Sequence, residues 1–157
     1  GMDAGAAIML AAGVVAVVSN ARPLPPERPG NATVSTDAWH PFTRARFDSL
    51  QQAGRVVFVD YSAAWCLSCQ VNERLVLDTD AMQQAFADAG IVTLRADWTR
   101  RDPSITQMLG RHGRSGVPLY VLYPAVPSRP PILLPTVLTS GHVLDGIRNA
   151  TTPAPGS

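Results

Sequence analysis

Cys66 and Cys69 are the residues of this chain whose types and spacing could do chemistry. On a helical turn, residues three positions apart are neighbours, so two cysteines at that spacing can close a disulfide. At the start of a helix, Cys66 would have free backbone N–H groups and the positive end of the helix dipole to stabilise its thiolate. The pair therefore suits reversible dithiol exchange, in which the exposed Cys66 attacks and Cys69, one turn deeper, resolves.

Cysteine pairs of this kind also occur in zinc sites and as structural crosslinks. A closed zinc site needs four ligands, whereas this chain has two cysteines and three scattered histidines, His40, His112 and His142. A crosslink that closes so short a loop removes little entropy from the unfolded chain. The composition therefore favours a redox pair, with no metal and no cofactor beyond the disulfide itself.

A buried strand must precede the cysteines and position them. Residues 56–59, VVFV, form a continuous apolar run, which is typical of a strand covered on both faces in a parallel or mixed sheet. The active-site helix should then extend over residues 66–77. We expect Leu67, Val71 and Leu75 to form its buried stripe.

Shorter elements with recognisable caps should surround this centre. We expect helices after Thr43, after Asp78 or Thr79, after Asp102 and from Thr139 or Ser140. Further strands are expected over residues 91–96, 119–123 and 132–134. The last helix should turn Val143, Leu144 and Ile147 inward. These elements predict an α/β fold, a central mixed β-sheet flanked by helices on both faces.

Several separated motifs resemble the thioredoxin superfamily. They are Asp60 six residues before Cys66, Trp65 directly before it, the Cys-x-x-Cys pair, and Gly116-Val117-Pro118 before an apolar run. More narrowly, VDYSAAWCLSCQVNER, ADWTRRDP and SGVPLYVLY are similar to the C-terminal thioredoxin-like domain of the DsbD-type thiol:disulfide interchange proteins. The resemblance covers residues 39–147. The chain departs from the pattern at Ala64, where many relatives have an acidic residue, and in the proline-rich stretch 124–135.

The resemblance implies roles for particular residues around the catalytic Cys66 and Cys69. Pro118 should face the dithiol after a cis peptide bond, and Trp65, Val117 and Pro118 should bind the partner, which would pair as an added strand with the Val117 backbone. Asp60 and Glu73 match acidic residues that tune the cysteine pKa values. Because like charges oppose ionisation, both carboxylates should keep Cys66 mainly a thiol at neutral pH. A solvated Glu73 paired with an arginine is the simpler alternative.

The chain divides by composition into four parts. Residues 1–20 are an apolar segment, expected to be a truncated membrane helix, a signal-like remnant or a helix packed on its own domain. Residues 21–37 are a proline-rich linker, residues 38–150 the thioredoxin-like domain and residues 151–157 a tail. The sequence has no basic stripe of the kind that would indicate a nucleic-acid partner, and its net charge is only +1.

The motifs predict a dithiol reductase, and the resemblance implies that it is extracytoplasmic. The resemblance implies that it passes electrons from an adjoining membrane domain to oxidised proteins on the periplasmic side of the bacterial inner membrane. Leu67 and Ser68, between the cysteines, offer no histidine or cation to hold a thiolate, which favours a reducing potential. The alternative is a non-catalytic thioredoxin-like adaptor or a copper chaperone, although no histidine is clearly placed as a third copper ligand.

Overall fold

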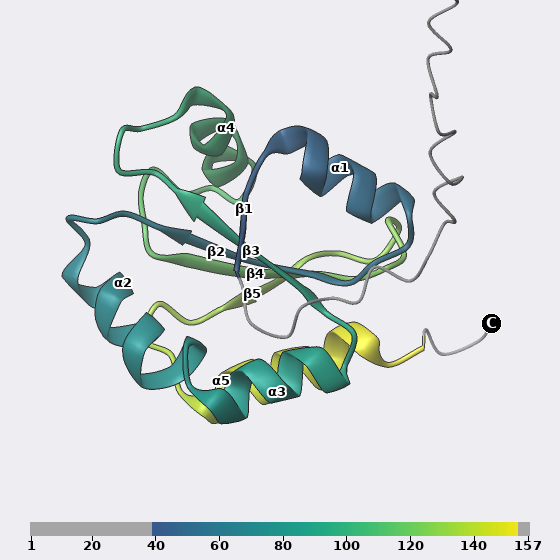
Figure 1. Ribbon diagram of the computed structural model, residues 1–157. Coiled ribbons are helices and arrows are strands. Elements are labelled where there is room, and N and C mark those ends of the chain that lie inside the picture. Colours follow the sequence, from purple (N-terminus) through teal and green to yellow (C-terminus); the bar gives the residue numbers. More distant parts are fainter. Residues whose placement is uncertain (1–38, 154–157) are drawn as a thin grey trace, which may run out of the picture. The chain divides into compact units, whose positions relative to one another are not determined.

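The computed structural model describes residues 39–153, which form a mixed sheet covered by helices on both faces (Figure 1). The apolar segment 1–20 and the linker 21–37 lie outside the described residues. The sheet has five strands in the order β1-β3-β2-β4-β5. Their bounds are β1 His40–Pro41, β2 Val57–Ser62, β3 Val92–Asp97, β4 Leu119–Tyr123 and β5 Ile132–Leu134. The predicted α/β architecture is therefore confirmed.

Strand β2 lies at the centre of the sheet and sets its register. It pairs in parallel with β3, where Asp60 lies opposite Arg95, and antiparallel with β4. All six of its residues are buried, and residues 57–59 of the predicted apolar run lie within it. Alternate residues face opposite sides, so Val57 and Val59 belong to one core cluster and Phe58 to the other.

Two helical layers complete these cores (Figure 1). Helices α1 (Arg44–Gln52) and α4 (Pro103–Arg111) cover one face, while α3 (Asp80–Asp88) and α5 (Ser140–Thr151) cover the other. Expected side-chain caps begin all four: Thr43, Thr79, Asp102 and Thr139 each accept a hydrogen bond from a first-turn backbone N–H. None of the described helices is both apolar enough and long enough to span a bilayer.

The stripe predicted for the active-site helix is wrong. Leu67, Val71 and Leu75 are 74%, 47% and 70% exposed, and the residues that face the protein interior are instead Cys69, Asn72, Val76 and Leu77. The helix is also divided: α2 (Leu67–Asn72) is α-helical, and the continuing turn η1 (Glu73–Leu77) is a π-helix. Because the disulfide at the start of α2 turns Cys69 inward, the face three and four residues further on is buried, and the leucine face points outward.

A second error concerns α5. Val143 and Ile147 are buried as predicted, but Leu144 is 37% exposed. Successive helical residues are rotated by about 100°, so the position after Val143 points away from the core. Gly146 occupies the inward face instead, close to the side chains of Leu122 and Leu134.

Candidate dithiol site

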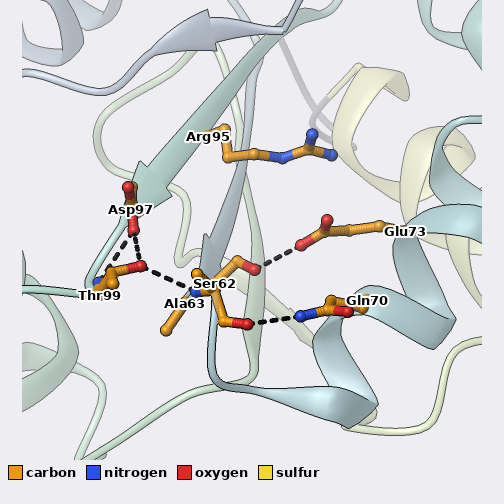
Figure 2. A pocket seen from close by; sticks show the side chains of 8 residues that line it. Ser62, Ala63, Gln70, Glu73, Arg95, Asp97 and Thr99 are labelled. Atoms are coloured by element: carbon orange, nitrogen blue, oxygen red, sulfur yellow. Dashed lines mark hydrogen bonds between the residues drawn. The ribbon is translucent and has the colours of Figure 1, made fainter.

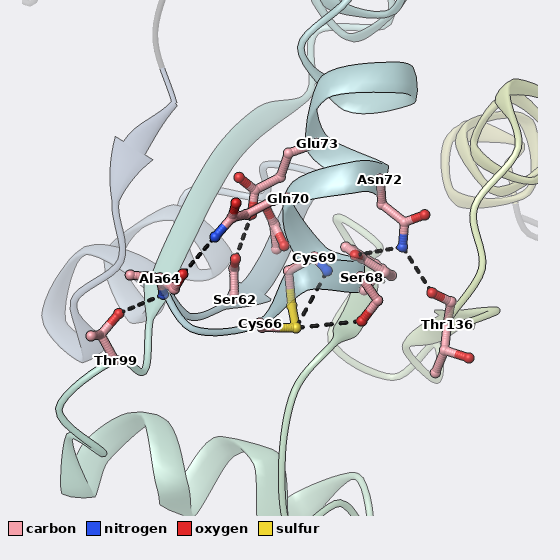
Figure 3. Close-up of a disulfide and its surroundings, with 12 residues drawn as sticks. Ser62, Ala64, Cys66, Ser68, Cys69, Gln70, Asn72, Glu73, Thr99 and Thr136 are labelled. Atoms are coloured by element: carbon pink, nitrogen blue, oxygen red, sulfur yellow. Dashed lines mark hydrogen bonds between the residues drawn. A yellow bond between two sulfur atoms is a disulfide. The ribbon is translucent and has the colours of Figure 1, made fainter.

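Cys66 and Cys69 form a disulfide at the start of α2, beyond the end of β2 (Figure 3). Their Cα atoms are 5.3 Å apart. Cys66 is the N-cap residue, and its Sγ accepts the backbone N–H of Cys69 at 3.3 Å. Cys66 is 7% exposed and Cys69 is completely buried. The helix start therefore offers the Cys66 sulfur an N–H that would also stabilise a thiolate, and Cys66 is the more accessible cysteine.

The loop before β4 brings the predicted partner-binding residues to the disulfide. The Val117–Pro118 peptide bond is cis, as the resemblance implied. Val117 packs against the buried cluster of Ala63, Cys66 and Cys69. Trp65, directly before Cys66, is 54% exposed. A partner that reaches the disulfide would thus find an exposed indole and the backbone before the cis-proline nearby.

Thr99 braces the turn that carries the cysteines, and the sequence reasoning did not single it out. Its Oγ1 accepts the Ala64 N–H at 2.8 Å (Figure 3) and donates to Asp97 (Figure 2). Its carbonyl accepts the Trp65 indole N–H at 3.2 Å. Gln70 holds the same turn from the helix side by donating to the Ala64 carbonyl at 2.5 Å. The motif ADWTRRDP, which contains Thr99, was the only available signal.

Asp60 is completely buried behind this turn. Its Oδ2 accepts a hydrogen bond from Arg95 Nε at 3.1 Å, while its Oδ1 has no partner in the described part of the chain. Burial raises the pKa of Asp60 to about 7, an effect that Arg95 opposes and Glu73 reinforces. The carboxyl group can therefore gain or lose a proton near neutral pH.

Glu73 lies on the same side of the site as Asp60. Its carboxylate accepts a hydrogen bond from the Ser62 hydroxyl, and both residues line an open cavity of about 210 Å³ next to the disulfide turn (Figure 2). Glu73 is half-buried and forms no ion pair within residues 39–153, so the alternative of an arginine-paired surface residue is not what the structure shows. The cavity connects solvent to a carboxylate that influences Asp60.

Arg95 supplies a cation that the sequence reasoning omitted. It bonds Asp60, its Nη2 lies 3.0 Å from Asp78 Oδ1, and its guanidinium lies 4.4 Å from the Trp39 ring centroid. It also lines the cavity that contains Glu73 (Figure 2). This positive charge offsets part of the repulsion that two carboxylates would exert on a thiolate. Only the pairing of β2 with β3 places it there.

The histidines occupy separate elements. His112 caps α4 and its Nε2 lies 2.7 Å from the Tyr123 hydroxyl, while His40 is in β1 and His142 in α5. Burial and neighbouring Arg111 lower the pKa of His112. Across residues 39–153, no three His, Cys, Asp or Glu side chains are grouped as metal ligands would be.

Comparison with known proteins agrees with this geometry. Residues 38–125 match the model of a thioredoxin-like family. The chain is 36% identical over 102 residues to thiol:disulfide interchange protein DsbD 1 of Pseudomonas aeruginosa, covering 63% of this chain and 16% of that protein. It is 33% identical over 124 residues to DsbD of Klebsiella pneumoniae, and this match covers 75% of this chain and 20% of that protein. The chain thus spans a fifth or less of the length of these relatives.

Solved structures show the same fold. The oxidised C-terminal domain of Neisseria meningitidis DsbD superposes with a TM-score of 0.56 at 21% identity, covering 72% of this chain and 99% of that domain. A thioredoxin from Thermus thermophilus superposes with a TM-score of 0.54 at 18% identity, and the superposition covers 73% of this chain and 86% of that thioredoxin. The expected thioredoxin-like fold is therefore confirmed.

Proposed function

The chain belongs to the thioredoxin-like family, and from this premise we propose that it is a thiol:disulfide oxidoreductase working as a dithiol reductase. The Cys66–Cys69 disulfide at the start of α2 is the observation that carries the proposal. A redox pair at a helix N-terminus, beside an exposed tryptophan and a cis-proline, suits attack on a protein disulfide.

The reaction transfers two electrons and two protons. In the reduced chain, the Cys66 thiolate attacks one sulfur of a partner disulfide, the partner S–S bond breaks, and the released partner thiolate takes a proton. Cys69 then loses its proton and attacks the Cys66 sulfur of the mixed disulfide. The second partner thiolate leaves and takes a proton, and the Cys66–Cys69 disulfide forms again. The partner is reduced and the chain is oxidised.

Reduction is the direction that the site's chemistry favours. Of the two residues between the cysteines, Ser68 places its hydroxyl 3.5 Å from Cys66 Sγ, and this hydroxyl carries no charge. Without a histidine or cation in the motif, the thiolate is less stabilised and the disulfide is harder to reduce than in strongly oxidising relatives. Electrons would therefore flow from this chain to oxidised partners.

The proposed setting is the periplasmic side of a bacterial inner membrane. The similarity to DsbD proteins supports it, as does the much greater length of those relatives. In this arrangement an adjoining membrane domain reduces the disulfide, and the chain passes the electrons to oxidised periplasmic thiol proteins.

The surrounding residues have distinct proposed roles. Trp65, Val117 and Pro118 contact the partner, and the Val117 backbone pairs with its extended chain. Asp60 and Glu73 tune the cysteine pKa values. Buried Asp60, whose pKa of about 7 allows proton exchange at neutral pH, is suited to take the proton that Cys69 must lose.

Insulin reduction with dithiothreitol as electron source tests the function. Wild type should accelerate insulin precipitation, and Cys66→Ala should not. With an oxidised protein partner, Cys69→Ala should accumulate a mixed disulfide because no thiol resolves it, whereas Cys66→Ala should trap none. A titration with Cu(I) on the reduced chain checks the alternative. Tight copper binding without insulin reduction would support a copper chaperone. The absence of both activities would support a non-catalytic adaptor.

A further inference from the structure

Arg101 lies beside Trp65, the residue directly before Cys66, and takes no part in the chemistry described above. We propose that Arg101 is a specificity residue, whose guanidinium, held over Trp65 and Trp98, selects partner disulfides flanked by a carboxylate. This inference rests on the proposed reductase function and adds a partner chemistry to it.

Two tryptophans hold the Arg101 side chain in place. Its Cζ lies 4.9 Å from the Trp98 ring centroid and 5.8 Å from that of Trp65, and the two rings lie 6.1 Å apart. Trp98 is 4% exposed and its indole N–H donates to Thr106 at 2.8 Å, so it is a fixed platform. A stacked guanidinium loses less freedom on binding a partner than one on a free side chain.

Arg101 is exposed and has no carboxylate partner in the described part of the chain. The nearby acids are engaged by their own turns. Asp97 accepts hydrogen bonds from the backbone and hydroxyl of Thr99, and Asp102 accepts those of Ser104 and the Ile105 N–H. The guanidinium donors of Arg101 therefore remain available to a bidentate carboxylate from outside.

The backbone at this position is unusual. Arg101 has a φ of +53°, and within residues 39–153 every other residue with positive φ is a glycine. This left-handed conformation is unfavourable for a side chain that lacks a local hydrogen bond, and glycine would relieve it. An arginine thus occupies a position where local backbone preference opposes a side chain, which points to a use for that side chain.

Arg101 lies where a partner disulfide must dock. Trp65 directly precedes Cys66, and Gly116, one residue before Val117, lies against Trp98: a Cβ there would be 3.8 Å from the indole. The cation is therefore held by one tryptophan that directly precedes Cys66 and by another that lies against Gly116, in the loop before the cis-proline. A partner carboxylate a few residues from its disulfide would reach it during attack by Cys66.

Two synthetic cystine peptides provide the test, identical except for a Glu or a Lys two residues after the second cysteine. The chain, first reduced with dithiothreitol and desalted, is mixed with each peptide, and the rate of peptide reduction is measured. Wild type should reduce the Glu peptide about fivefold faster, as expected for one exposed charge pair, and about 0.5 M salt should shrink the difference. Arg101→Gln should abolish the preference and Arg101→Glu reverse it.

Matched variants separate specificity from folding and from reactivity. Arg100→Gln removes the neighbouring exposed charge, which stacks on neither ring, and should keep the preference. Arg101→Gly removes the charge but suits the positive φ, so it should lose the preference while its unfolding free energy stays equal or rises. All variants should reduce uncharged bis(2-hydroxyethyl) disulfide at the wild-type rate.

The outcomes distinguish a failure of the specificity inference from a failure of the proposed reductase function. A preference that survives Arg101→Gln, or that wild type lacks, would overturn the inference while leaving the reductase function standing. If the Arg101 variants also change the rate at which the uncharged disulfide is reduced, the effect lies in the reactivity of the dithiol, and the specificity inference is overturned. If wild type reduces none of the three disulfides, the reductase function itself fails.

Discussion

Asp60 shows how one buried residue can link folding to redox chemistry. It lies in the middle of β2 with one carboxylate oxygen bonded to Arg95 and the other without a partner among the described residues. A carboxylate in this position is poorly solvated, so its neutral form is favoured until the pH approaches 7. In the proposed tuning role, its charge would add to that of Glu73 in opposing a thiolate, and Arg95 would offset part of it.

A thiolate titration by ultraviolet absorbance on the reduced chain tests this balance. We expect Asp60→Asn and Glu73→Gln each to lower the apparent pKa of Cys66, by about one pKa unit, because each removes a negative charge near the thiolate. As a control, Arg95→Gln should raise the pKa of Cys66. If neither carboxylate variant lowers it, the tuning role is excluded while the dithiol function stands.

The stability of the oxidised chain should depend on pH through Asp60. Its pKa rises from 3.8 to about 7 on folding, so between these values the folded state binds more protons and stability falls as the pH rises. Urea unfolding should show a loss of at most about 4 kcal/mol from pH 4 to pH 8. Asp60→Asn should flatten this profile, and Asp48→Asn, at a partly exposed position of α1, should keep it. A wild-type profile that rises with pH would contradict the assignment.

At the scale of elements, the active-site helix turns its predicted apolar stripe outward. Leu67, Val71 and Leu75 recur every four residues along α2 and η1 and remain exposed, whereas Val76 and Leu77 enter the core. The π-turn at Glu73–Leu77 adds a residue to the helical repeat, and its first residue, Glu73, accepts a hydrogen bond from Ser62. The same turn contributes Val76 and Leu77 to the core.

Two leucines in η1 make this arrangement measurable. Leu77→Ala should lower the free energy of unfolding by about 2–5 kcal/mol, because it empties a fully buried position. Leu75→Ala, the matched exposed change, should alter it by less than about 0.5 kcal/mol. If urea titrations show equal losses of unfolding free energy for the two variants, the stripe of Leu67, Val71 and Leu75 would be buried after all.

Glycines in two helices offer a second comparison. A Cβ at Gly146 would lie 2.7 Å from Leu122 Cδ1 and 2.9 Å from Leu134 Cδ2, so Gly146→Ala should destabilise the chain by roughly 1–3 kcal/mol through overpacking of α5 on the sheet. Gly110 in α4 has open space around it, and Gly110→Ala should stabilise by up to about 1 kcal/mol. Thermal unfolding distinguishes them, and a stabilising Gly146→Ala would refute the tight contact.

At the scale of the whole molecule, the site is assembled where separate strands end or begin. Ser62 ends β2, Asp97 ends β3, and the cis-proline loop enters β4 from the same side because β4 runs antiparallel to β2. Chain segments far apart in sequence thus converge on the disulfide turn (Figure 3). The site depends on the sheet topology as much as on the Cys-x-x-Cys motif.

The redox potential is the property of the whole site that decides direction. Equilibration of the chain with glutathione buffers, followed by quantification of free thiols, should give a potential nearer to that of thioredoxin, about −270 mV, than to the strongly oxidising enzymes near −120 mV. Cys69→Ala, which cannot form the disulfide, is the baseline. A value near the oxidising limit would overturn the assignment as a reductase.

Local signals in the sequence determined much of this protein. The cysteine spacing, the Thr and Asp caps, the apolar run of β2 and the strand after the cis-proline all depend on residues close together in the chain. Cys66 and Cys69 were singled out by their own spacing, whereas Asp60 and Glu73 were singled out only by the resemblance to DsbD-type domains, and their tuning role stays a prediction.

Only the tertiary structure decided which faces and which distant partners meet. The buried face of α2 depends on the inward turn of Cys69, a constraint that apolar periodicity does not contain. Arg95 reaches Asp60 through the register of β2 with β3, and Thr99 reaches the cysteine turn from the loop after β3. Because strand pairing sets these contacts across more than thirty residues of sequence, no local pattern could reveal them.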